Sequence, residues 1–387
     1  MKENEQTQVP LWTRQFLLIT IINLFLYFAF QLVTPTISVY VKSLGAADNV
    51  IGWLNGIFTL AALIARPLAG SSLDRLGRRG IFLAGMAVFI AAATSYAWVP
   101  TIVLILILRF IHGIGWGASS TALYTIASDN IPNQRYGEGM GFFTLASNIA
   151  MAAAPATGLA LIAAYGYKAV SVLSGSLAIV ALLFSLRVKY KEIPGTQDMH
   201  GKRVLFEKTS FRPASVMFFL TITYGSLNTF LALYAMERGI GQFGLFFTVM
   251  ALSMMIARPL FGRIVDRYGV SVAVVPGMAG MALSIFLLSR ATTLTMFLVV
   301  AFLYGMGFGA AQSSLQTLAV IHAPRSNLGI ANSTFFFGFD SGIGAGAVIL
   351  GTLAAKVGYS QMFQWSIVSV ALAFVLYFVT GRKEQRK

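Results

Sequence analysis

Apolar stretches of about twenty residues alternate with short polar segments along this chain. Each stretch is long enough to cross the ~30 Å hydrocarbon layer of a membrane as a helix. Division at the polar segments predicts an all-α integral membrane protein with twelve transmembrane helices. The predicted spans are residues 16–41, 50–71, 80–98, 101–127, 138–163, 168–187, 212–236, 242–262, 270–289, 294–320, 327–354 and 359–381.

Composition supports a lipid environment. Hydrophobic residues make up 57% of the 387 residues and charged residues only 11%, against about 25% charged residues in soluble domains. The first apolar run is longer than the core of a signal peptide and has no small-residue cleavage site, so we expect it to be the first span. The chain has no cysteine, which excludes disulfides and thiolate metal sites.

The net charge of +15 is distributed unevenly. With a cytoplasmic N-terminus, the predicted outer loops carry five basic residues and Arg109 lies within a helix, which leaves 22 of the 28 Lys and Arg on the cytoplasmic side. The five are Lys42, Lys168, Arg238, Arg290 and Lys356. This asymmetry follows the positive-inside rule and predicts a multi-pass plasma-membrane protein with both termini in the cytoplasm. The basic charge therefore indicates topology, and we expect no nucleic-acid partner.

The chain repeats itself. Residues 64–70 read IARPLAG and residues 256–262 read IARPLFG, an offset of 192. The same offset places Asp74 on Asp266, Arg75 on Arg267, and Gly113, Gly115 and Gly117 on Gly305, Gly307 and Gly309. One constant register over about a hundred residues indicates duplication. We therefore expect two pseudo-symmetric six-helix bundles, residues 1–187 and 212–387, joined by a cytoplasmic linker at 188–211.

A charged motif follows the second span. It consists of Gly70, Asp74, Arg75, Gly77, Arg78 and Arg79, with a shorter copy over residues 262–269. It resembles the signature between helices 2 and 3 of the major facilitator superfamily. That resemblance implies alternating access and a cytoplasmic gate latch, in which Arg78 would pair with Asp129 at the end of helix 4. The alternative is that these charges only enforce topology.

The fourth predicted helix carries Arg109 and His112 ahead of a glycine series. This stretch is similar to a second superfamily signature, associated with proton-coupled members. An arginine near the centre of a membrane costs at least ~2.5 kcal/mol unless it faces a cavity or partner, so Arg109 is a functional candidate; snorkelling is its alternative. His112 is a candidate for proton coupling because a histidine can titrate near neutral pH; packing against a neighbouring helix is the alternative. The glycines also fit a dinucleotide fingerprint, but no strand precedes them, which favours close helix packing.

The fifth predicted helix contains Ala154, Pro155 and Gly158. They resemble a signature of antiporter branches, which implies a hinge and export in exchange for protons. Alanines replace two of its glycines, at 150 and 154, so a generic packing motif is the competing interpretation.

Asp340 is the one carboxylate deep in a predicted span, and the equivalent position in the first half holds Asn148. The sequence shows no fixed positive partner for Asp340. A buried carboxylate without such a partner favours its neutral form, which suits a group that takes up and releases a proton. A hydrogen-bonded packing acid is the alternative.

Polar and aromatic residues within the spans are candidates for a substrate cavity, unless they face neighbouring helices or lipid. They are Gln31, Asn55, Asn148, Tyr224, Asn228, Gln312, Gln316 and Phe336. Several cation exporters of the family that this chain resembles place a carboxylate in the first span, and this chain has none there, so the resemblance argues against a purely cationic substrate.

The sequence has no phosphate-binding loop, no metal cluster and no Ser–His–Asp set in its spans, so we expect neither an ATP-driven pump nor an enzyme. We expect a proton-coupled exporter of small amphipathic or apolar molecules. Its partners are the substrate, protons and the bilayer; it needs no cofactor and works as a monomer. A proton-coupled symporter for uptake of a small metabolite is the alternative.

Overall fold

The computed structural model describes residues 10–132, 135–190, 206–321, 323 and 328–384, without the side chains at 71, 74–76, 136–137, 266, 328–329 and 382–384. Helices form nearly all of this described chain. They are α1 (Arg14–Ser43), α2 (Asp48–Leu76), α3 (Arg78–Ser95), α4 (Ile102–Asn130), α5 (Tyr136–Tyr165), α6 (Tyr167–Ser185), the 3-10 turn η2 (Lys208–Ser210), α7 (Phe211–Glu237), α8 (Leu245–Tyr268), α9 (Ser271–Leu288), α10 (Leu294–Ile321) and α11 (Leu328–Glu384).

Eleven helices of the described chain are long and apolar enough to cross a membrane. Helices suit this solvent because each satisfies its own backbone hydrogen bonds where no water is present. Proline at 35, 67, 155, 259 and 276 lies inside these helices, which membrane helices tolerate because neighbouring groups can satisfy the freed carbonyls.

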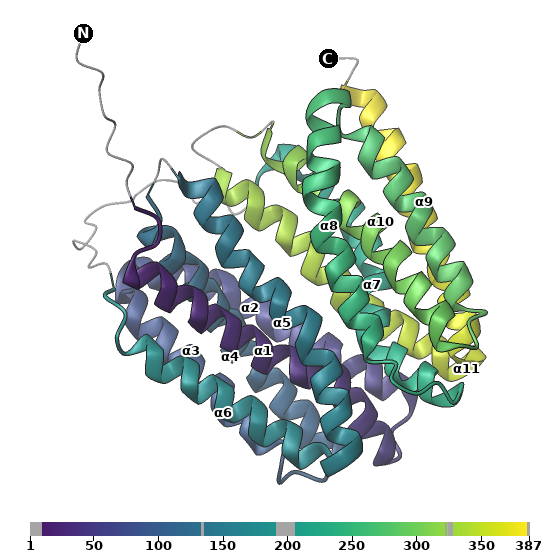
Figure 1. The fold of residues 1–387 in the computed structure, drawn as a ribbon, viewed down its shortest axis with the longest axis horizontal. Helices are drawn as coiled ribbons and strands as arrows, with labels where there is room; N and C mark the ends of the chain where they lie inside the picture. The colour runs from purple at the N-terminus through teal and green to yellow at the C-terminus, as the bar shows by residue number, and fades with distance from the viewer. Residues whose placement is uncertain (1–9, 133–134, 191–205, 322, 324–327, 385–387) are drawn as a thin grey trace.

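α11 departs from a single span. Its 57 residues would extend ~85 Å at ~1.5 Å per residue, about twice the thickness of a bilayer. The helix is interrupted at Gly358, whose φ of 77° and ψ of 167° suit glycine because it lacks a Cβ. In Figure 1 the yellow-green first part of α11 runs away from the upper edge of the molecule and the yellow last part returns to it.

The helices lie in two groups, α1–α6 on one side and α7–α11 on the other (Figure 1). Within the first group α4 packs on α2 and α3, while α1 packs on α5 and α6; within the second group α10 packs on α8 and α9, and α11 on α7. The groups meet where α2 contacts α11, α5 contacts α8, and α1 contacts α7. Because α2 corresponds to α8 and α5 to the start of α11 at the 192-residue offset, the α2–α11 and α8–α5 contacts are equivalent.

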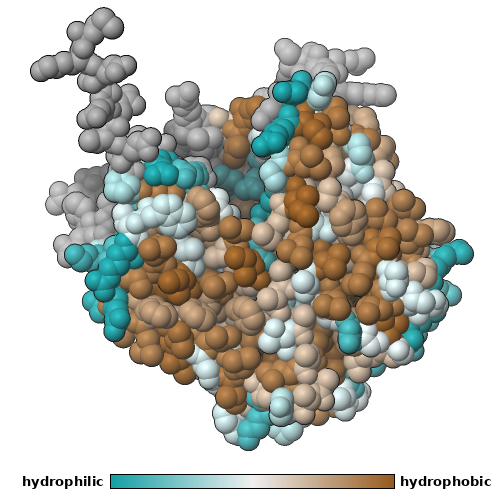
Figure 2. Space-filling model, viewed as in Figure 1, coloured by the Kyte–Doolittle hydropathy of each residue, from teal (hydrophilic) through white to brown (hydrophobic). Residues whose placement is uncertain are grey.

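The surface between the ends of the helices is apolar. Figure 2 shows brown, hydrophobic residues over the sides of both groups and teal, hydrophilic residues toward the edges. Leu60, Ile64 and Leu68 of α2, for example, are 50–62% exposed. A continuous apolar surface of this kind fits a lipid environment and is rare on soluble monomers.

Glycines set the closest helix contacts, and they do so equivalently in both groups. A Cβ built at Gly115 would lie 2.5 Å from the Phe89 nitrogen, and one built at Gly117 would lie 2.8 Å from the Ala62 oxygen. At the equivalent Gly307 it would lie 2.6 Å from the oxygen of Gly277. The glycine series of the fourth helix therefore packs α4 on α2 and α3, and its repeat packs α10 on α8 and α9.

This packing makes Gly113 sensitive to substitution. A Cβ there would overlap the backbone oxygen of Phe58 in α2, and overpacking of this kind costs about 1–3 kcal/mol. We expect Gly113→Ala and the equivalent Gly305→Ala to lower the midpoint of thermal unfolding in detergent. Gly141→Ala on α5 is the control, because nothing lies within 4 Å of its Cβ position. Equal midpoints for all three variants would contradict the packing argument.

Candidate functional site

An ion pair joins the two groups of helices inside the membrane-spanning region. Nη2 of Arg66 on α2 lies 3.1 Å from Oδ2 of Asp340 on α11, with side chains 33% and 19% exposed. The expectation that Asp340 lacks a positive partner is therefore corrected. Arg66 and Arg258 lie inside the apolar spans of α2 and α8, so they also do not belong to the basic residues counted on the cytoplasmic side.

Two tyrosines of the first group of helices lie near this ion pair and near Arg258. Tyr27 of α1 lies within electrostatic range of both Arg66 and Asp340, and its hydroxyl donates a 3.4 Å hydrogen bond to the hydroxyl of Tyr124 on α4. Tyr124 in turn lies within electrostatic range of Arg258 on α8. Each arginine of the repeated IARPL sequence therefore lies near one of these two tyrosines, Arg66 near Tyr27 and Arg258 near Tyr124.

Arg109 occupies a separate, enclosed cluster. Its side chain is 1% exposed; Nη2 donates to Oδ1 of Asn55, and the guanidinium lies 4.9 Å from the centre of the Phe58 ring. Nδ2 of Asn55 donates a 2.8 Å hydrogen bond to Oγ1 of Thr229 on α7, so the cluster also reaches across the two groups. Neither Arg109 nor its neighbour His112 has a polar contact with Asp340 in the described structure.

His112 is fully buried. Its Nδ1 lies 3.3 Å from the hydroxyl of Tyr96 on α3, and its ring packs edge to face against Phe89, with centroids 4.5 Å apart. In the described chain its Nε2 has no hydrogen-bond partner. These contacts place His112 among packed side chains of α3 and α4.

The helices close on one another at the end of the molecule that carries the α1–α2 turn, here called the closed end. The hydroxyl of Tyr359, just after the break in α11, donates a 2.6 Å hydrogen bond to Oδ1 of Asp48 on α2. The same oxygen accepts a 2.6 Å bond from Lys42. Nearby, Gly52 of α2 packs directly on the carbonyl of Ala347, and Thr248 of α8 donates a 2.6 Å bond to the carbonyl of Ala152 on α5.

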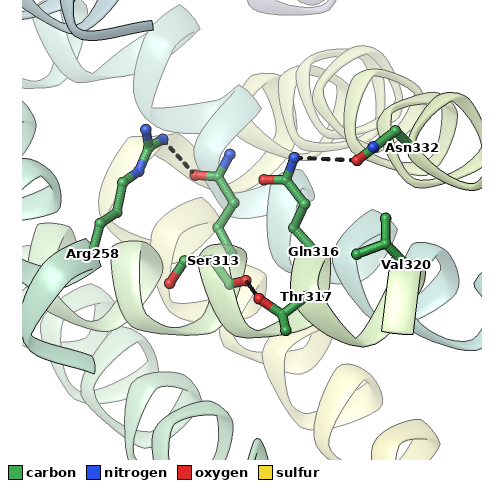
Figure 3. Close-up of a pocket in the computed structure, with 7 residues that line it drawn as sticks. Arg258, Ser313, Gln316, Thr317, Val320 and Asn332 are labelled. Carbon is green, nitrogen blue, oxygen red and sulfur yellow. Dashed lines mark hydrogen bonds between the residues drawn. The ribbon is translucent and has the colours of Figure 1, made fainter. Parts of the chain in front are cut away.

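A polar cavity of about 400 Å³ lies toward the opposite end, here called the open end. It is lined by Arg258, Gln312, Ser313, Gln316, Thr317, Val320 and Asn332. Figure 3 shows the labelled side chains of Arg258, Gln316 and Asn332 on the same side of α10. Figure 2 shows a recess with hydrophilic residues in its wall between the two groups at the upper edge. The cavity reaches from the middle of α8 and α10 to the last turn of α10.

Hydrogen bonds orient the amides of this cavity. A nitrogen of Arg258 donates to Oε1 of Gln312 at 3.4 Å, and Nε2 of Gln316 donates to Oδ1 of Asn332 at 3.4 Å. Arginine can only donate, so Gln312 must present its oxygen to Arg258 and its NH₂ group elsewhere.

The other residues expected in a cavity take different places. Asn55 belongs to the Arg109 cluster, Gln31 is buried in α1, and Asn228 donates to the Tyr224 carbonyl at 3.0 Å. Tyr224 stacks on Phe308 and its hydroxyl donates to Sδ of Met151 on α5 at 3.2 Å. Phe336 is half-buried against Phe335 and Phe339, and Asn148 is half-buried on α5. Gln312 and Gln316 alone of this set line the cavity of Figure 3.

The motif between α2 and α3 contains an ion pair. Nε of Arg78 lies 3.0 Å from Oδ2 of Asp129, and Nη1 of Arg78 donates to the carbonyl of Leu73 at 3.1 Å. Gly77 ends α2 with a φ of 84°. A Cβ at Gly70 would meet nothing within 4 Å, so no described part of a neighbouring helix packs closely against Gly70.

The remaining motif positions are exposed or outside the described structure. Arg79 and Arg267 are exposed. The side chains of Asp74, Arg75 and Asp266 lie outside the described part of the structure.

The helix-5 motif lies where α5 meets α1 and α8. α5 continues through Pro155 without a break. Ala154 is fully buried, and a Cβ at Gly158 would lie 2.8 Å from the Leu32 carbonyl of α1. Ala156 lies against Gly244 at the start of α8. The motif thus sits at one of the equivalent contacts between the two groups.

The family model of the Major Facilitator Superfamily matches residues 19–244 and 214–387. The chain belongs to the Major Facilitator Superfamily. It is therefore a multi-pass membrane protein of a family of transporters and not an enzyme, as the sequence predicted.

Similar proteins in this superfamily include exporters. The chain is 26% identical to an uncharacterized MFS-type transporter of Methanocaldococcus jannaschii, over 89% of this chain and 92% of that protein. It is 23% identical to the multi-drug resistance efflux pump PmrA of Streptococcus pneumoniae, over 91% and 92%. Other relatives are named as export or multidrug resistance proteins. The chain thus resembles the drug-efflux branch of the superfamily.

The fold is similar to that of solved transporter structures. A bacterial homologue of the human lysosomal transporter Spinster, solved in an inward-facing and unoccupied conformation, superposes with a TM-score of 0.79 at 16% identity, over 95% of this chain and 96% of that one. The arrangement of helices is therefore that of the Major Facilitator Superfamily.

Sequence reasoning missed Arg66 and Arg258 as site residues. The signal was present, because IARPL places an arginine inside an apolar run twice, 192 residues apart. A repeated intramembrane arginine is a candidate by the same argument that selected Arg109. The partner of each arginine could not be read, since Asp340 and Gln312 are distant in sequence.

The closed end provides a direct test of its hydrogen bond. In a Val348→Cys background, whose cysteine would face Gly56 of α2, we expect Tyr359→Phe to raise the rate of labelling by a membrane-impermeant thiol reagent. A hydrogen bond to a charged group contributes ~1.5–3 kcal/mol, so a rise of roughly tenfold is expected. The chain has no other cysteine, and labelling is measured in vesicles of both orientations.

Ser360→Ala is the matched control for this measurement. Its hydroxyl donates to the carbonyl of Ser289, within the second group of helices, and its loss should leave the labelling rate unchanged. A Tyr359→Phe rate equal to that of the Ser360→Ala variant would show that the bond to Asp48 does not hold this end closed.

Proposed function

We propose that this transporter is a proton-coupled exporter of small amphipathic or apolar molecules that works by alternating access. In this proposal α11 crosses the membrane on both sides of Gly358, which makes twelve spans in two six-helix bundles, residues 1–187 and 212–387, joined by a linker at 188–211. The protein acts as a monomer in the plasma membrane, with both termini in the cytoplasm.

The observation that carries the proposal is the Arg66–Asp340 ion pair. It joins α2 to α11 at 3.1 Å, and the contact between α2 and α11 is one of those at which the two groups meet. Protonation of Asp340 removes the negative charge and leaves Arg66 without its partner, so the attraction between α2 and α11 depends on a proton. A group that links proton binding to the contact between the two bundles is what coupling requires.

The closed and open ends support alternating access. At the closed end the two groups are joined by the Tyr359–Asp48 bond and by glycine contacts, while the cavity lies toward the open end. The loops of the open end carry most of the basic residues of the chain, so the positive-inside rule places that end in the cytoplasm. The structure then corresponds to an inward-facing state.

In the other state the open end must close, and the motif between α2 and α3 is suited to that step. Arg78 and Asp129 form their pair within the first group of helices, and Gly70 has space beside it. We propose that Gly70 and the charges around it meet the second bundle when this end closes. Residues 154–158 of α5 act as the hinge beside α8, and Arg109 modulates the step through Asn55 and Thr229.

The proton role of Asp340 is tested by substitution in proteoliposomes. Three fluorescent probes share one aromatic body: N-dansylglycine is anionic, dansylamide neutral and dansylcadaverine cationic. We expect Asp340→Asn to abolish the pH-gradient-driven accumulation of a transported probe, down to the level of protein-free liposomes. Binding of that probe should remain, because the asparagine is close in size and only the titrating group is lost.

Glu138→Gln is the control, since Glu138 forms an exposed pair with Arg135 and should transport normally. Gradient-driven transport by Asp340→Asn equal to the parent protein would refute the proton role. The direction is read in inverted vesicles with an acidic interior: an exporter accumulates the probe there, whereas a symporter for uptake releases it.

A further inference from the structure

The two arginines of the repeated IARPL sequence have different surroundings. Arg66 pairs with Asp340 across the two groups of helices. At the 192-residue offset, Asp340 corresponds to Asn148 on α5, so the equivalent partner position for Arg258 holds a neutral amide. The duplication thus provides two guanidinium groups and only one of the two matching carboxylates.

Arg258 has no carboxylate partner in the described structure. Its direct polar contact is the 3.4 Å bond to Gln312, and the groups within electrostatic range of it are the hydroxyls of Tyr124 and Tyr224. The other described acids form pairs of their own or lie elsewhere. Those pairs are Lys42–Asp48, Arg66–Asp340, Arg78–Asp129 and Arg135–Glu138.

An arginine at this position is costly unless something compensates its charge. A guanidinium at the middle of a membrane helix costs ~2.5–3.5 kcal/mol on insertion scales, and such residues face cavities or partners. Arg258 faces the 400 Å³ cavity, and such a volume is typical of small-molecule sites. The cavity wall offers one full positive charge and no described carboxylate.

The neighbouring polar groups fit an anion that enters this cavity. Gln312 accepts from Arg258, so its NH₂ group can donate to a second oxygen of the same ligand. Tyr224 stacks on Phe308 with ring centroids 5.0 Å apart, and Phe308 packs on Phe339 at 6.2 Å. Tyr224 and Phe308 are buried and neither lines the cavity, so these rings pack near Arg258 without forming the wall of the site.

We infer that the cavity binds amphipathic molecules that carry a carboxylate, with Arg258 as the residue that holds the negative group and Gln312 as its second donor. This inference rests on the proposed transport function and narrows its substrate class to organic anions. Arginine suits the role because its planar fork of donors matches a carboxylate. The bound anion supplies the negative charge that Asn148 does not.

The test measures binding of the three dansyl probes to the purified full-length chain in detergent by fluorescence. We expect N-dansylglycine to bind at least about tenfold more tightly than dansylamide, the effect of roughly 1.4 kcal/mol from one charge-assisted contact. Arg258→Gln should remove this preference and leave the affinity for dansylamide unchanged. Arg258→Lys should retain the preference, because the charge remains.

Arg263→Gln is the matched control, because Arg263 lies on the same helix and is exposed; it should leave all three affinities unchanged. The inference is overturned if the parent protein binds the three probes equally or binds none of them. It is also overturned if Arg258→Gln binds N-dansylglycine as the parent does. Arg258→Lys, which keeps the positive charge, shows whether the arginine itself is needed for the protein to fold.

Failure of this inference can be distinguished from failure of the proposed function. Proton-driven transport without preference for N-dansylglycine would leave the exporter proposal intact and reject the anion site. A preference for N-dansylglycine that depends on Arg258, without any proton-driven transport, would support the anion site and reject proton coupling.

Discussion

The cost of a charge inside the membrane governs this structure. An unpaired ionised group in hydrocarbon is expensive, so each one must find a partner, an aromatic face or water. Asp340 meets Arg66, and Arg109 meets the amide of Asn55 and the ring of Phe58. Arg258 faces a cavity. In the first two cases the contacts extend between the two groups of helices, because those are the surfaces shielded from lipid.

Close contact between helices is the second requirement, and glycine provides it. Where Gly115 and Gly307 remove side chains, helix backbones of the same group approach each other. Where Gly52 packs on Ala347, backbones of different groups do so. The first kind of contact holds each group together, and the second kind lies at the interface that would open and close in the proposed alternating access. Rigid groups with a separable interface are what alternating access needs.

Much of the fold could be predicted from sequence because the hydrocarbon layer imposes a length on each span. The span predicted at 101–127 corresponds to α4, and polar residues near 130 mark its end. The duplication was equally readable, since IARPL and the glycine series occur twice in one register. The break in α11 at Gly358 lies in the short gap left between the last two predicted spans.

The site was less predictable, because its contacts join residues far apart in sequence. Asp340 is recognisable in the sequence as an intramembrane acid. Its partner, Arg66, lies in the other half of the chain, and no local pattern indicates that the two residues pair. Arg78 and Asp129 were matched through the family motif, and the structure places them 3.0 Å apart. Polar residues such as Asn55 and Gln312 are alike in sequence, yet one is sealed among helices and the other lines a cavity; only packing separates them.

The glycine contacts at the closed end have a consequence for how this end can move. Dispersion forces between touching backbones fall steeply within an ångström of separation, and the bond from Tyr359 to Asp48 is equally short in range. A small displacement therefore forfeits nearly all of the attraction at once, and an intermediate gap has little to hold it. The closed end should therefore be either fully closed or fully open. This limits the time in which a continuous path for ions could cross the membrane.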